Sequence, residues 1–79
     1  GMTRLTEAFA ALGLEWIESA GNFVAVRVGA ADAVNRALLA QGVIVRPIAG
    51  YGMPEWLRVS VGLPEENERF IVALKRALA

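Results

Sequence analysis

The chain has 79 residues, with eight basic and eight acidic side chains, and it contains neither cysteine nor histidine. A chain of this length makes one small domain. Its 56% of apolar residues is too high for a disordered segment, and a formal net charge of zero gives no electrostatic attraction to nucleic acid. The composition also excludes disulfides, a thiolate nucleophile, an imidazole base and the usual zinc ligand sets.

The N-terminus and the hydropathy of the chain indicate where the protein is located in the cell and which kinds of partner it has. No apolar run approaches the roughly 18 residues of a membrane span, and the N-terminus lacks the pattern of a secretion signal, so we expect a cytoplasmic domain with no membrane or nucleic-acid partner. Residues 1–2 resemble a tag remnant, which leaves a single domain over 3–79. The mean hydropathy of +0.45 indicates either a surface for a partner domain or second copy, or simply a high alanine content.

Apolar spacing and turn residues predict seven elements in chain order: a helix at 3–12, strands at 14–18 and 23–28, a helix at 30–41, strands at 43–46 and 56–61, and a helix from residue 64 onward. Thr3 is the expected N-cap of the first helix, and Pro47 is expected to stop the strand before it. The short connections favour an α/β (α+β) two-layer sandwich, in which helices cover one face of a small sheet of three or four strands.

Three arginines are expected on the uncovered face of this sheet. The alternation of the strands directs valines and leucines toward the helices, and therefore Arg27, Arg46 and Arg58 away from them. A guanidinium group is permanently charged, and its planar fork fits carboxylate or phosphate. We expect Arg27 to be an ordinary surface residue, whereas Arg46, beside a rigid proline, and Arg58, in a strand that otherwise packs, are candidates for an anion site.

The segment between these two candidates contains Tyr51 between Gly50 and Gly52. Glycine allows backbone to approach a ligand, and Tyr51 would then donate a hydrogen bond to an anion; equally, the segment is only a turn that caps the sheet. Lys75, the only lysine, is expected in the last turn of the final helix, where it balances the helix dipole rather than carrying a cofactor.

Four stretches of the second half together resemble one known family: residues 42–47 (GVIVRP), 50–54 (GYGMP), 57–62 (LRVSVG) and 64–67 (PEEN). They are similar to the C-terminal part of histidinol-phosphate aminotransferases, within the class I and II aminotransferases. The resemblance extends over nearly the whole chain from residue 3.

The resemblance implies the small domain of a fold type I enzyme that uses pyridoxal 5'-phosphate, with the large cofactor-binding domain outside this chain. It implies that Arg58 binds the substrate carboxylate or phosphate and that Arg46 assists with the phosphate. The implied reaction takes histidinol phosphate and 2-oxoglutarate to imidazole acetol phosphate and glutamate in histidine biosynthesis. No catalytic, cofactor-binding or metal-binding residue is expected in these 79 residues, so the chain alone should be inactive. The expected partners are the large domain, an anionic small-molecule substrate and a second copy in a homodimer.

Two alternatives stay open at this point. Related small domains belong to aromatic aminotransferases and to threonine-phosphate decarboxylases. The chain would otherwise be a free-standing interaction module that dimerises through the uncovered sheet face, with its arginines paired to acidic residues of the partner.

Overall fold

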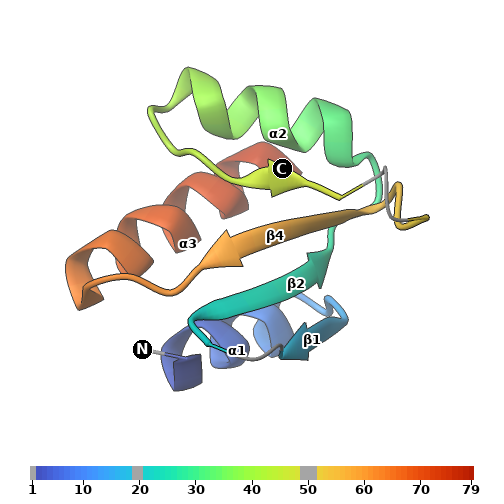
Figure 1. Cartoon of the computed structure of the whole chain (residues 1–79). Coiled ribbons are helices and arrows are strands. Elements are labelled where there is room, and N and C mark those ends of the chain that lie inside the picture. Colours follow the sequence, from blue (N-terminus) through green and yellow to red (C-terminus); the bar gives the residue numbers. More distant parts are fainter. Residues whose placement is uncertain (1, 19–20, 49–51) are drawn as a thin grey trace.

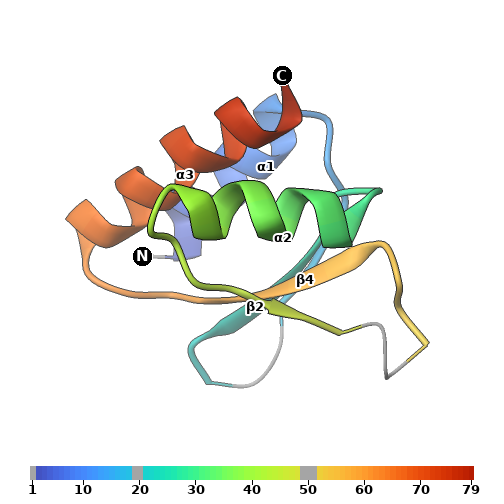
Figure 2. The same ribbon diagram turned by 90° about the horizontal axis from the view of Figure 1, so that it is seen from above.

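The computed structural model describes residues 2–18, 21–48 and 52–79. In this part of the chain, helices lie on one face of a four-stranded antiparallel sheet and leave the other face bare (Figures 1 and 2). The elements are α1 (Met2–Ala11), β1 (Trp16–Glu18), β2 (Phe23–Arg27), α2 (Ala31–Ala40), β3 (Arg46–Pro47), β4 (Trp56–Ser60) and α3 (Pro64–Leu78). The expected two-layer α+β sandwich is confirmed.

The sheet brings together strands that are far apart in the sequence. Its strand order is β1-β2-β4-β3, so β4 lies between β2 and the short edge strand β3. The β2–β4 pair runs from Phe23 opposite Ser60 to Arg27 opposite Trp56. The backbone of β4 is therefore held from both sides.

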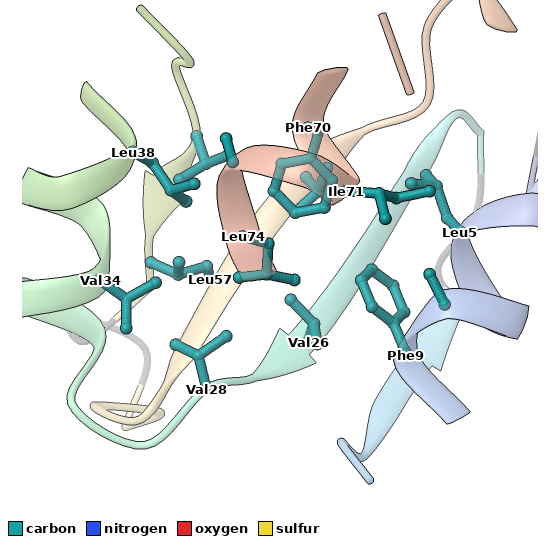
Figure 3. Packing of buried hydrophobic residues seen from close by; sticks show 14 of the residues in the cluster. Leu5, Phe9, Val26, Val28, Val34, Leu38, Leu57, Phe70, Ile71 and Leu74 are labelled. Atoms are coloured by element: carbon teal, nitrogen blue, oxygen red, sulfur yellow. The ribbon is translucent and has the colours of Figure 1, made fainter. Parts of the chain in front are cut away.

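The hydrophobic core fills the space between the sheet and the helices (Figure 3). Because side chains of a strand alternate between faces, β2 and β4 each send two apolar residues into this space. The largest fully buried side chains are Phe9, Leu5, Leu38, Leu57, Ile71, Leu74, Val24 and Val26. Phe9 of α1 and Phe70 of α3 meet edge to face, with ring centroids 6.3 Å apart, and this contact ties the two helices together.

The helices begin and end where the local chemistry allows. Gly42 follows α2 with φ of 79°, a left-handed conformation that residues with a side chain rarely adopt. Pro64 opens α3, and Lys75 and Arg76 lie in its last turn, near the negative end of the helix dipole. Among the described residues, no helix is long and apolar enough to cross a membrane.

Two details of the sequence prediction are wrong. The strand expected at 43–46 is β3, which contains only Arg46 and Pro47, so Pro47 lies within the strand and does not stop it as expected. A proline is tolerated there because an edge strand has one side without a partner that would need its missing N–H. Thr3 is not an N-cap, because α1 begins at Met2 and Met2 packs against the core. The carbonyl oxygen of Thr3 instead accepts a hydrogen bond from Thr6 Oγ1 at 3.1 Å.

The adjacent leucines of α2 provide a matched test of this packing. Leu38 is fully buried, whereas Leu39 is 58% exposed. Leu38→Ala should lower the free energy of unfolding by about 2–5 kcal/mol, because it leaves a cavity, whereas Leu39→Ala should change it by less than about 0.5 kcal/mol. Urea unfolding of the two variants measures both values. Equal losses would contradict the orientation of α2.

An ion pair joins α1 to α3 on the surface. Arg4 Nε and Nη2 donate to the two carboxylate oxygens of Glu68, and both side chains are about half exposed. The hydrogen bond from Arg4, with its charge, lowers the pKa of Glu68 below its ordinary value of 4.5. A carboxylate with a lowered pKa stabilises the fold above the pKa it has in the unfolded chain, and this contribution is lost as pH falls.

Glu68→Gln should therefore lower the thermal midpoint at neutral pH, and the difference from the original chain should disappear as the pH drops below 4.5. Because the pair is exposed, added salt should reduce the difference. Glu18→Gln, outside the ion pairs of the described residues, is the control. A difference that persists unchanged at low pH would show that the charge of Glu68 is not its cause.

Candidate anion-binding site

Arg46 and Arg58 lie opposite each other on β3 and β4. Their strand neighbours Val45, Leu57 and Val59 are buried toward the helices, so the two arginines point to the bare face of the sheet. Directly opposed residues of an antiparallel pair share a face and lie within side-chain reach. The expected position of both arginines is thus confirmed, and their role as ligands for an anion stays a prediction.

The opposition of these two positive charges is unfavourable by itself, because like charges directly across a strand pair repel. In the part of the chain that the structure describes, no carboxylate forms an ion pair with Arg46 or Arg58. Arg46 is exposed and Arg58 is half-buried. An anion from outside this part of the chain would relieve the repulsion and use the donors of both guanidinium groups.

Arg27 lies on the same face but is already neutralised. Its Nη1 lies 3.0 Å from Glu15 Oε1, and its Nη2 lies 2.7 Å from Glu55 Oε1. Arg27 Nε donates a hydrogen bond to Glu55 Oε1, and Nη1 donates one to Glu15 Oε1. The hydrogen bond with Glu55 is the largest cause, and that with Glu15 the next, of a pKa of Arg27 above its ordinary value. Arg27 is therefore a surface residue with partners of its own. This arrangement agrees with the prediction that Arg27 is an ordinary surface residue and not part of an anion site.

Phe23 is a neighbour of Arg58 to which the sequence analysis gave no role. The guanidinium carbon of Arg58 lies 4.6 Å from the centroid of the Phe23 ring, within the range of a cation–π contact. Phe23 opens β2, and its half-buried ring lies on the bare face, since its partner across the strands, Ser60, is on that face. The contact depends on the antiparallel register of β2 and β4, which are not consecutive strands. Only the folded sheet sets this register, so the sequence pattern did not reveal the contact.

The junction between β4 and α3 is fixed by a buried amide. Asn67 Oδ1 accepts a hydrogen bond from the Gly62 N–H at 3.0 Å, and Asn67 Nδ2 donates to the Gly62 carbonyl oxygen at 3.2 Å. Glu66 adds a hydrogen bond of 2.8 Å from the Leu63 N–H to its own Oε1. These contacts set the direction in which the chain leaves the strand that carries Arg58.

A groove of about 260 Å³ lies beside this junction, and neither of the two arginines lines it. Its walls come from residues 42–45, from the end of β4 at Val59 and Ser60, and from the first turns of α3. The groove and the arginine pair are therefore separate features. Charged side chains also line this groove, namely Glu66 and Arg69, but the opposed arginine pair is not among them.

The remaining predicted positions have different outcomes. Tyr51 lies outside the described residues. Lys75 is exposed in the last turn of α3, as expected. A lysine that carries pyridoxal phosphate needs a desolvated pocket, and the surroundings of Lys75 do not provide one, so the described residues do not fit this cofactor. Nor do they include a cluster of three or more acidic, histidine or cysteine side chains that could hold a metal ion.

Comparisons with known proteins identify close relatives. The chain is 64% identical along its whole length to histidinol-phosphate aminotransferase 2 of Ralstonia nicotianae, and 61% identical to histidinol-phosphate aminotransferase 2 of Pseudomonas aeruginosa. In both cases it spans only 22% of the relative's length.

Solved structures contain the same fold. A putative aminotransferase from Burkholderia pseudomallei matches with a TM-score of 0.83 at 29% identity, covering 96% of this chain and 24% of that one. A decarboxylase from Sulfurospirillum multivorans matches with a TM-score of 0.82 at 31% identity, covering 99% of this chain and 24% of that one. The family model for aminotransferase class I and II matches residues 2–74. The chain belongs to the class I and II aminotransferase family.

Proposed function

We propose that this chain is the substrate-clamping C-terminal domain of a histidinol-phosphate aminotransferase that depends on pyridoxal phosphate. The observation that carries the proposal is the opposed pair of Arg46 and Arg58, which have no carboxylate partner among the described residues. The assignment of histidinol phosphate as the substrate is supported by the names of two relatives that are 64% and 61% identical to this chain. The longer protein transfers an amino group from histidinol phosphate to 2-oxoglutarate, giving imidazole acetol phosphate and glutamate.

Arg58 is the group that binds the negative end of each substrate. A guanidinium fork accepts a carboxylate or a phosphate in the same two-point geometry. Glutamate and 2-oxoglutarate present a carboxylate, and histidinol phosphate presents a phosphate, so one side chain serves both halves of the reaction. Arg46 adds a second positive charge, which favours the more highly charged phosphate.

The two arginines are held by the sheet to different degrees, which fits different roles in binding. Arg58 lies in the middle of β4, paired with Ala25 on one side and with Arg46 on the other. Arg46 lies on an edge strand of two residues and is exposed. A rigid strand holds a binding group where a substrate can be oriented for reaction, so Arg58 is the anchor and Arg46 assists.

We assign the cofactor chemistry and the recognition of the substrate to different parts of the longer protein. The cofactor, when bound by the rest of the longer protein, supplies the electron sink for amino transfer. The 79 residues supply recognition and orientation of the substrate anion. The exposed Ile17 and Ile44 support a contact with the large domain or with a second copy, and the proposal includes a homodimer in the cytoplasm.

The related decarboxylase is a second candidate, since its fold matches almost the whole chain. Its identity of 31% is half that of the named aminotransferases. The sequence similarity therefore favours amino transfer over decarboxylation.

Arg58→Lys in the longer protein should raise KM for both substrates and lower kcat, with kcat/KM falling by about 10- to 100-fold, because a point charge cannot replace a two-point fork. Arg27→Lys is the matched control: it lies on the same face, but its donors are occupied by Glu15 and Glu55. Its kinetic constants should stay within about twofold of the original. Steady-state kinetics in both directions measure the effect, and an unchanged Arg58→Lys enzyme would reject the assignment.

A further inference from the structure

We infer that Phe23 is a positioning residue, whose ring holds the Arg58 guanidinium in the orientation that receives the substrate anion. This inference rests on the proposed function, because it gives Phe23 a task only if Arg58 binds an anion. The observation behind it is the 4.6 Å separation between the Arg58 guanidinium carbon and the Phe23 ring centroid.

The register explains why the ring is the neighbour that Arg58 meets. Directly across from Arg58 on β2 stands Ala25, which carries only a methyl group. The diagonal neighbours on β2 are Phe23 and Arg27, two residues to either side of Ala25. Arg27 is occupied by two carboxylates, so Phe23 is the diagonal neighbour that contacts Arg58.

A ring contact restrains an arginine without using up its hydrogen-bond donors. The Arg58 guanidinium carbon lies over the Phe23 ring, and such a cation–π contact uses the charge of the group without occupying its five N–H donors. A salt bridge, like those of Arg27, would occupy the donors that a substrate needs. The contact with Phe23 therefore restricts the side chain in advance and leaves the two-point fork open, which reduces the ordering that binding requires.

The ring also acts against the repulsion from Arg46. With a positive charge directly across the β3–β4 pair, the Arg58 side chain would otherwise turn away from the site. The negative face of an aromatic ring attracts the cation from the opposite side. Phe23 and Arg46 thus lie on the two flanks of Arg58, one attracting and one repelling, and a bound anion satisfies both arginines.

The test uses the longer holoenzyme and compares Phe23→Leu with Phe23→Tyr. Leucine keeps the apolar bulk but removes the ring face, so the inhibition constant of glutarate and KM for 2-oxoglutarate should rise by about three- to tenfold, with kcat at saturation changed by less than about twofold. Tyrosine keeps the ring face and should restore both constants to within about twofold of the original. Phe70→Leu, which removes a buried ring from the other face of the sheet, should lower the thermal midpoint without changing either constant.

A second series separates this inference from the proposed function. In an Arg58→Gln background, Phe23→Leu should cause no further loss of glutarate affinity, because the ring acts only through the guanidinium. If Arg58→Gln alone leaves glutarate affinity unchanged, the proposed function is wrong. If Arg58→Gln weakens glutarate binding but Phe23→Leu does not, or if the effect of Phe23→Leu persists without Arg58, only the positioning role is overturned.

Discussion

Arg46 and Arg58 stand opposite each other across the β3–β4 pair, and two like charges in this register repel each other. Nothing described within the chain neutralises this repulsion, although Glu15 and Glu55 neutralise Arg27 on the same face. Arg27 is paired with carboxylates of the residues that immediately precede β1 and β4. The opposed pair, in contrast, needs an anion from outside the described residues. A substrate with a carboxylate or phosphate is such an anion.

The fold maintains this unfavourable pair through features that lie away from it. The core beneath the sheet includes Leu57 and Val59, the residues on either side of Arg58, so burial on one face fixes the direction of the arginine on the other. The side-chain amide of Asn67 fixes the backbone just after β4, because it hydrogen-bonds both the N–H and the carbonyl oxygen of Gly62. Hydrophobic burial and a few hydrogen bonds thus stabilise a surface charge arrangement that is unfavourable on its own.

The sequence predicts the part of this arrangement that depends on local pattern. Strict alternation in 56–61 places Arg58 on the bare face, because shifting it to the other face would expose Leu57 and Val59. The Phe23 contact was not predictable in this way, because no periodicity along the chain encodes a diagonal neighbour on another strand. The extent of β3 was missed for a similar reason: pairing with β4 sets it, and the valine-rich run at 43–45 indicates apolar packing without specifying a partner.

The most direct test of the account follows the arginine side chains themselves during a phosphate titration. In the longer protein labelled with 15N-arginine, inorganic phosphate should shift the Nε–H resonances of Arg58 and Arg46 together, with one saturation curve, because both guanidinium groups contact the same anion. The resonance of Arg27, held by Glu15 and Glu55, should stay in place. Independent curves for Arg58 and Arg46, or shifts confined to Arg27, would contradict a shared anion site on this face of the sheet.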